Sequence, residues 1–313
     1  MISRDGRVIP NILTQTFCVQ TDDQCVADTE GTEGNDMQLG IRLHDTENLP
    51  FEERIAAVHE MGYKCGHLAL SKIPGLPAAP AALTPGYAMY LRRVFEKNEV
   101  DVAVLGCYLN LADPDEDRLK VIRGKYEASI RFASLLGAGM VGTETGAPNS
   151  EYKSCPECRS EEALESFIRE LKSVVRIAEN FGVMFAIEPV AKHIVWNADR
   201  ARIVLDEVAS PNLGIIFDPV NLLDESNYQN RDEIFAHTIE VLGDDIIMLH
   251  LKDFVPGEGG LKSVGCGLGE MDYTRILKFI KEKKPYIHAT LENTTPADHA
   301  SCRDRILGIY ERS

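Results

Sequence analysis

Four short apolar runs dominate the second half of the chain, and each contains an acidic residue or a histidine. They cover residues 185–190, 215–219, 246–253 and 287–293. Continuous runs of this length, rich in Ile and Val, predict strands buried on both faces, as in a parallel sheet covered by helices. A chain with this pattern has to place several polar side chains at the ends of buried strands.

The polar residues in these runs require a common explanation. They are Glu188, Asp218, His250 and Glu292. Burying an unpaired carboxylate is costly, and three together would repel one another unless a cation lay between them. We therefore predict that these four side chains bind one divalent metal ion, the alternative being strand-end caps and ion pairs. The oxygen-rich donor set favours Mn, with Mg, Co or Zn also possible.

Apolar runs and amphipathic stretches alternate eight times along the chain. Predicted strands cover residues 39–44, 65–70, 102–108 and 140–144 in addition to the four runs above. Predicted helices cover about 50–61, 86–98, 116–136, 160–181, 198–208, 231–242, 272–284 and 296–310. This alternation predicts βαβ units in the α/β class, and eight units can close into a (β/α)8 TIM barrel. An open doubly wound sheet is the alternative, but a barrel directs all C-terminal strand ends into one mouth.

The first 36 residues are polar and show no strand or helix pattern. We predict that residues 1–36 are an N-terminal extension and that residues 37–313 form a single catalytic barrel domain. A barrel of roughly 250 residues is normal for this architecture, so a chain of 313 residues needs no second large domain.

Charge and hydropathy exclude several classes of partner. The chain has 33 basic and 49 acidic residues, a net charge of −16, which argues against nucleic-acid binding. No apolar run reaches the ~18 residues of a membrane span, and no signal peptide is evident, so we expect a cytoplasmic protein without a membrane partner. The eight dispersed cysteines are typical of free thiols in a reducing compartment.

Strand periodicity identifies a cation beside the predicted metal. Side chains two residues apart share a face of a strand, so Met248 and Lys252 lie on the face of His250, while Leu249 and Leu251 point outward. Lys252 therefore either contacts substrate or forms an ion pair with a ligand carboxylate.

The ordered motifs at the ends of strands five to eight resemble a known family. They are Ile-Glu-Pro at 187–189, Phe-Asp-Pro-Val-Asn at 217–221, His-Leu-Lys-Asp at 250–253 and Leu-Glu-Asn at 291–293. With them, residues 37–310 resemble the sugar phosphate isomerase/epimerase family, the xylose isomerase-like barrels that include ketose 3-epimerases and endonuclease IV. The resemblance implies that Glu188, Asp218, His250 and Glu292 bind Mn or a similar ion and that Glu188 and Glu292 also act as an acid/base pair.

The implied function is a divalent-metal-dependent isomerase or epimerase of a sugar or sugar phosphate. The metal would polarise a carbonyl and an adjacent hydroxyl, which eases removal of the proton from the neighbouring carbon. A dehydratase of keto-sugars or keto-inositols is the alternative, because it begins with the same step. A non-catalytic sugar-binding barrel would be expected to have lost ligands, and all four are present.

Departures from the family pattern bear on substrate and reaction. Asn221 stands where many epimerases have a histidine three residues after the strand-six aspartate. Residues 107–110 read Cys-Tyr-Leu-Asn, and no Asp-x-His follows His250, so the extra ligands of endonuclease IV are missing. This disfavours a phosphodiesterase of that kind and favours a mononuclear metal site.

Seven residues are candidates for binding a carbohydrate substrate. They are Arg42, His67, Asn110, Glu144, His193, Asn221 and Lys252. Arg42 suits a substrate carboxylate or phosphate, and the two amides suit hydroxyls because they both donate and accept hydrogen bonds. For Glu144 the alternative is a salt bridge within the barrel, and for the two asparagines it is a role in fixing their own loops.

Two cysteine and glycine motifs have less specific interpretations. Cys155 and Cys158 form a single C-x2-C with no second pair, so we expect loop thiols without a catalytic role. The glycine-rich residues 265–269 follow strand seven with the wrong spacing for a dinucleotide loop, and we expect a flexible lid or loop there. By analogy with the family, association into a homo-oligomer is also possible.

Overall fold

The structure is a computed structural model that describes residues 36–313. The predicted N-terminal extension, residues 1–36, therefore lies outside the described residues except for Asp36. The same holds for Cys18 and Cys25, so the predicted free thiols are described only for the other six cysteines.

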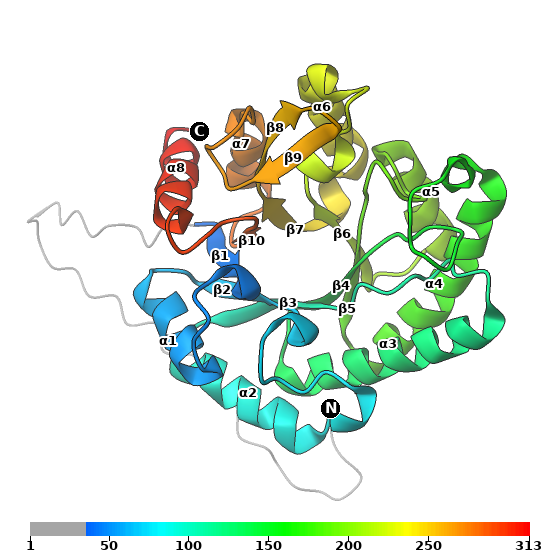
Figure 1. Cartoon of the computed structure of the whole chain (residues 1–313), viewed down its shortest axis with the longest axis horizontal. Coiled ribbons are helices and arrows are strands. Elements are labelled where there is room, and N and C mark those ends of the chain that lie inside the picture. Colours follow the sequence, from blue (N-terminus) through cyan, green and yellow to red (C-terminus); the bar gives the residue numbers. More distant parts are fainter. Residues whose placement is uncertain (1–35) are drawn as a thin grey trace, which may run out of the picture. The chain divides into compact units, whose positions relative to one another are not determined.

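Eight parallel strands close into a barrel, as the sequence predicts. They are β1 (Gln38–Arg42), β2 (Cys65–Leu68), β3 (Asp101–Gly106), β4 (Met140–Glu144), β5 (Met184–Glu188), β6 (Leu213–Phe217), β7 (Ile246–Leu251) and β10 (His288–Leu291). Their order around the barrel is β1-β10-β7-β6-β5-β4-β3-β2, and β1 pairs with both β10 and β2. Figure 1 looks into this ring of strands, with the helices outside it.

The helices between the strands agree closely with the prediction. They are α1 (Phe51–Glu60), α2 (Pro85–Lys97), α3 (Glu116–Leu136), α4 (Glu161–Phe181), α5 (Ala198–Val208), α6 (Arg231–Leu242), α7 (Thr274–Lys283) and α8 (His299–Arg312). Ser160 caps α4, because its hydroxyl accepts a hydrogen bond from the Ala163 N–H at 3.1 Å. Glycines in the left-handed conformation end α3 and α4 at Gly137 and Gly182.

The barrel interior is a small apolar cluster separate from the layer between strands and helices. It contains Cys65, Ala103, Val104, Met140, Ala186, Ile216 and Met248. Met248 belongs to it, whereas Leu249 and Leu251 belong to the outer core, which agrees with the periodicity of β7. A side chain at Gly142 would meet Val104 and Ile216 at less than 3 Å, so the glycine leaves room for the interior packing.

The segment after β7 differs from the prediction. A two-stranded antiparallel hairpin, β8 (Asp253–Gly257) and β9 (Gly260–Val264), takes up the last residue of the predicted strand, and the predicted loop at 265–269 begins directly after it. The buried carboxylate of Asp253 accepts N–H groups from Phe254, Gly267 and Met271 and so ties the following glycine-rich segment to the hairpin. The expectation of a flexible loop at 265–269 missed this anchor, because its partners lie up to 18 residues away.

No helix within residues 36–313 has the length and apolar character needed to cross a membrane.

Candidate active site and metal centre

The ends of four successive barrel strands bring the predicted metal ligands together. Glu188 is the last residue of β5, Asp218 directly follows β6, His250 lies in β7, and Glu292 directly follows β10. All four are buried, with exposures of 4% or less. Parallel strands place their carboxyl ends at one rim, so side chains about 100 residues apart in sequence meet in one mouth.

His250 lies at the centre of the cluster. Its Nδ1 is 3.2 Å from Glu188 Oε2 and 3.3 Å from Glu292 Oε1. The ligand atoms of Glu188, Asp218 and His250 lie within 4.8 Å of one another, which is close enough to share one ion. His250 therefore contacts both glutamates, Glu188 from earlier in the sequence and Glu292 from later in it.

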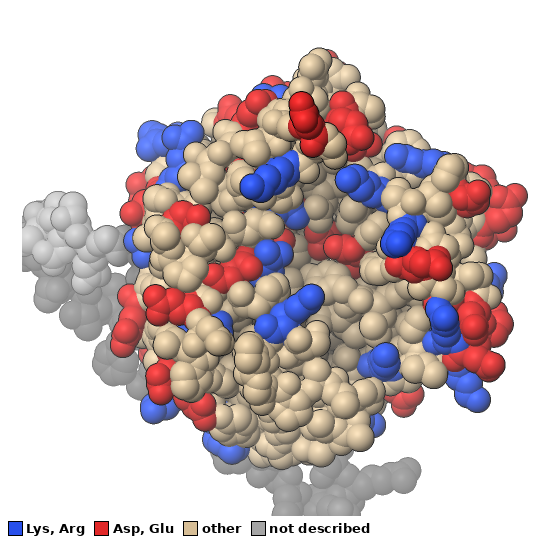
Figure 2. Space-filling view, viewed as in Figure 1, with Lys and Arg blue, Asp and Glu red and all other residues tan. Residues whose placement is uncertain are grey.

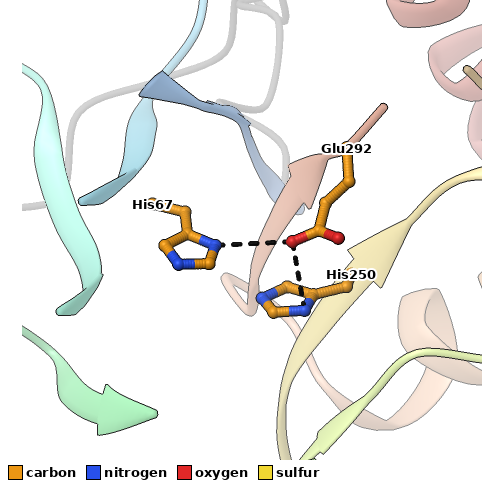
Figure 3. Close-up of side chains that lie close together, drawn as sticks. All are labelled: His67, His250 and Glu292. Atoms are coloured by element: carbon orange, nitrogen blue, oxygen red, sulfur yellow. Dashed lines mark ion pairs between the residues drawn. The ribbon is translucent and has the colours of Figure 1, made fainter. Parts of the chain in front are cut away.

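His67 joins this cluster from β2. Its Nδ1 is 3.4 Å from Glu292 Oε1, and its ring stacks on that of His250 with centroids 5.2 Å apart (Figure 3). His67, His250 and Glu292 form a second group whose ligand atoms lie within 4.8 Å of one another. The sequence suggested His67 only as a substrate contact. A histidine in a short buried strand was a signal that could also have suggested a ligand.

The donor set suits a divalent cation. His250 Nε2 is buried and has no hydrogen-bond partner among the described residues, which is unusual for a buried polar atom. Glu188 and Glu292 lie beside the other ring nitrogen, Nδ1, and Asp218 is the third buried carboxylate. Such a group is stabilised by a metal more readily than by its own ion pairs. Residues Glu188, Asp218, His250 and Glu292 could hold the ion, and His67 could add a further nitrogen.

The titration of the site reflects its mixture of burial and charge. Burial lowers the pKa of His250, but the carboxylates of Glu292 and Glu188 outweigh it and raise the pKa to about 9. Burial raises the pKa of Asp218 to about 6 despite the opposing charge of Lys252. Burial alone would raise the pKa of both glutamates, but His250 and the other nearby cations lower the pKa of Glu188 and bring that of Glu292 well below its usual value. Both glutamates are therefore ionised at neutral pH.

Lys252 is held in an ion pair with the cluster. Its Nζ lies 2.7 Å from Asp218 Oδ2 and 3.7 Å from Glu292 Oε2. Burial lowers its pKa, but the charges of Asp218, Glu292 and Glu188 together outweigh that effect, so the pKa is raised and the amine stays protonated. Its main chain is fixed as well, because Tyr273 Oη donates a hydrogen bond to the Lys252 carbonyl at 2.5 Å.

Two further predicted residues orient the glutamates. Asn221 Nδ2 donates to Glu188 Oε1 at 2.5 Å. Arg42 Nη1 lies 3.1 Å from Glu292 Oε2, and its Nε lies 2.9 Å from Asp45 Oδ2. Arg42 is therefore already shared between two carboxylates, and its contact with a substrate carboxylate or phosphate stays a prediction.

Glu144 and His193 form a second, more open group with Tyr152. Tyr152 Oη donates to Glu144 Oε2 at 3.3 Å, and His193 Nδ1 lies 3.5 Å from the same oxygen. The rings of Tyr152 and His193 stack with centroids 5.1 Å apart. Burial and the charge of Glu188 raise the pKa of Glu144 to about 7. Tyr152 comes from a loop, and no pattern in the sequence pointed to it.

Asn110 lies apart from these side chains. Its Nδ2 donates to the carbonyls of Ala147 and Asn149, and its Oδ1 accepts from the N–H groups of Ala112 and Ala147. The amide joins the loop after β3 to the loop after β4, which is the loop-fixing alternative considered for it.

The two loop thiols of the C-x2-C motif also lie outside the cluster. Cys155 Sγ and Cys158 Sγ are 3.8 Å apart, and both residues are free thiols. Their expected lack of a catalytic role stays a prediction.

Comparison with solved structures finds the same fold in several proteins. A D-psicose 3-epimerase from Clostridium cellulolyticum H10, solved with D-tagatose, is 16% identical, with a TM-score of 0.64 over 88% of this chain and 99% of that one. The IolI protein with a bound zinc atom is 17% identical, with a TM-score of 0.64 over 88% and 96%. A probable 3-DHS dehydratase from Bacillus anthracis, AsbF, is 11% identical, with a TM-score of 0.65 over 88% and 97%. At these identities the likeness establishes the fold only.

Sequence comparison assigns the family. No curated protein sequence matches the chain. The family model described as xylose isomerase-like TIM barrel matches residues 55–303, which include all four predicted metal ligands. The chain therefore belongs to the xylose isomerase-like TIM barrel family.

Proposed function

We propose that this protein is a divalent-metal-dependent isomerase or epimerase of a sugar or sugar phosphate. It would act by removing a proton from the carbon beside a carbonyl and returning it. The observation that carries the proposal is the placement of Glu188 and Glu292 on either side of His250, at 3.2 Å and 3.3 Å from the same nitrogen. Two buried, ionised carboxylates at one point can serve two faces of a substrate bound between them.

In this mechanism the two glutamates exchange a proton with the substrate. One carboxylate takes the proton from the carbon beside the carbonyl, and the other returns a proton to the opposite face, which inverts that carbon. Return of the proton to the former carbonyl carbon, with transfer of the neighbouring hydroxyl proton to the former carbonyl oxygen, instead gives isomerisation. Asn221 holds Glu188 and Arg42 holds Glu292, so each carboxylate has its own orienting partner.

Lys252 supplies positive charge close to Asp218 and Glu292. Its buried ammonium stabilises the negative charge that develops on the carbonyl oxygen as the proton leaves. A bound divalent metal supplies the chemistry of a Lewis acid to the same carbonyl. Glu188, Asp218, His250 and Glu292 would hold that ion, and their predominance of oxygen donors favours Mn, with Mg, Co and Zn as alternatives. The group around Glu144 and His193 would bind substrate hydroxyls.

Exchange of substrate hydrogen for deuterium tests this proposal. The protein is loaded with Mn, Mg, Co or Zn, its metal content is measured, and ketoses, keto-inositols and their phosphates are incubated with it in heavy water. Incorporation of deuterium beside the carbonyl, with conversion to an isomer or epimer, is expected. Glu188→Gln and Glu292→Gln should each slow exchange by about 10²–10⁴-fold, because each removes one proton-transfer group. Exchange that needs neither glutamate would contradict the proposal.

The same experiment distinguishes the alternative reactions. Exchange followed by loss of water from a keto-sugar or keto-inositol identifies a dehydratase, a reaction that shares the first step and that is named for one neighbour of the same fold. A protein that binds sugars without exchange would be a binding barrel. Cytoplasmic location and homo-oligomer formation stay predictions.

A further inference from the structure

A cavity beside the metal centre carries two lysines and no carboxylate. It has a volume of about 630 Å³ and lies between the loop after β2, the end of β3 and α3. Lys72 and Lys125 line it together with the hydroxyls of Ser71 and Ser129 and an apolar wall of leucines and alanines. This volume is within the range of small-molecule sites, about 300–1,000 Å³.

Tyr108 connects this cavity to the candidate active site. Its side chain lines the cavity, and its Oη lies 3.3 Å from His67 Nε2. His67 in turn lies 3.4 Å from Glu292. Tyr108 therefore contacts both the cavity and a member of the candidate metal centre.

A neighbouring cavity differs from the lysine-lined cavity because acidic residues line it. That second cavity, of about 540 Å³, shares Tyr108 and Lys125 but is also lined by Asp113, Asp115 and Asp117. Arg118 also lines that cavity, so its three aspartates face two basic residues, and an anion is less favoured there than beside Lys72. Figure 2 shows Lys and Arg side chains interspersed with Asp and Glu side chains around the hollowed face.

The two lysines are available to bind an anion. Both are exposed, and neither has an ion-pair partner among the described residues. Arg42, the residue that the sequence suggested for this purpose, is occupied by Asp45 and Glu292. Lysine ammonium groups on long stems and serine hydroxyls are typical partners of phosphate and carboxylate groups.

We propose that the cavity is a subsite for an anionic group, a phosphate or a carboxylate, carried by the substrate at a distance from its reacting carbonyl. The substrate class is therefore an acidic sugar derivative and not a neutral ketose. This inference rests on the proposed function for its catalytic readout, and binding tests it independently of catalysis.

The first measurement is binding. The dissociation constants of fructose, fructose 6-phosphate and 5-ketogluconate are determined by calorimetry with the metal-loaded full chain. We expect fructose 6-phosphate or 5-ketogluconate to bind at least about tenfold more tightly than fructose, the size of one charge-assisted hydrogen bond. The two acidic ligands distinguish a phosphate site from a carboxylate site.

The second measurement compares variants. Lys72→Met/Lys125→Met should weaken binding of the preferred acid about tenfold to a hundredfold and reduce its advantage over fructose. Lys97→Met/Lys120→Met is the matched control, because it removes the same charge from exposed positions on α2 and α3 outside the cavity. Equal binding of neutral and acidic ligands, or equal losses in the two double variants, would overturn the subsite.

Deuterium exchange with the same ligands separates the two proposals. The KM for exchange of the preferred acid should rise in Lys72→Met/Lys125→Met with a smaller change in kcat. Lysine-dependent binding of the acid without any exchange would leave the subsite in place and contradict the proposed reaction. Exchange that is equally fast for fructose and for both acids would support the reaction and contradict the subsite.

Discussion

The two halves of the barrel mouth hold their side chains in different ways. On the side of β5, β6, β7 and β10, the polar groups project from strand ends and are almost fully buried. On the side of β2, β3 and β4, His67 and Glu144 also come from strands, but Lys72 and Tyr152 come from the segments that follow strands and are partly or fully exposed. Strands hold a constellation rigidly and loops allow it to vary, so the first half is suited to chemistry and the second to recognition.

Removal of the central imidazole should have the largest effect in the molecule. His250→Ala is expected to abolish stoichiometric metal binding and to lower the exchange rate by at least about 10³-fold, because the ion loses its central ligand. Metal analysis after dialysis and deuterium exchange measure the two effects. His237→Ala, at an exposed histidine that pairs with Asp199, is the control. Full metal occupancy in His250→Ala would show that His250 is not a metal ligand.

Metal affinity should depend steeply on pH. In the metal-free protein His250 has a pKa of about 9, so below that pH a metal ion must displace its proton. Asp218, with a pKa of about 6, adds a second proton at lower pH. The affinity is expected to rise about tenfold per pH unit between pH 6 and 9 and then level off. Competition with a chelator of known pH dependence measures this, and a flat profile would show that His250 is not a ligand.

Loss of the buried cation should damage both stability and catalysis. Lys252→Met leaves Asp218 without its partner at 2.7 Å, and breaking a buried ion pair costs about 3–5 kcal/mol. Urea unfolding of the metal-free protein measures the cost, and Lys262→Met, at an exposed lysine on β9, is the control. Exchange by the metal-loaded variant should fall about 10²-fold. Equal stabilities of the two variants would show that the ion pair is not holding Asp218.

The smallest effect is expected in the recognition half. Tyr152→Phe keeps the ring that stacks on His193 but removes the hydrogen bond to Glu144. In the wild-type protein this hydrogen bond lowers the pKa of the Glu144 carboxyl and so opposes the effect of burial. The pKa of Glu144 should therefore rise above about 7 in the variant. If Glu144 binds a substrate hydroxyl as a carboxylate, KM at pH 7 should increase about two- to fivefold with kcat nearly unchanged. The pH dependence of KM measures the shift, and a fall in kcat alone would place Tyr152 in the catalytic half.

Local pattern was sufficient for the barrel because its elements are regular. The ranges predicted for α3, α5 and α6 are those of the structure, since amphipathic periodicity and cap residues act within a few positions of one another. The anchoring of the segment that follows the hairpin of β8 and β9 was not predicted, because Asp253 binds backbone groups up to 18 residues away. Asn110 was ambiguous for the same reason, since its partners Ala147 and Asn149 belong to another loop.

The sequence by itself determined the eight strands and the helices that cover them. It also determined that four polar residues lie at one rim of the barrel. Strand periodicity and the shared direction of the strands leave few other arrangements. Only the tertiary structure decided that His67 stacks on His250, that Arg42 is taken by two carboxylates, and that Lys72 and Lys125 face one cavity beside Tyr108. Those relations depend on distances between elements far apart in the chain, which no local pattern encodes.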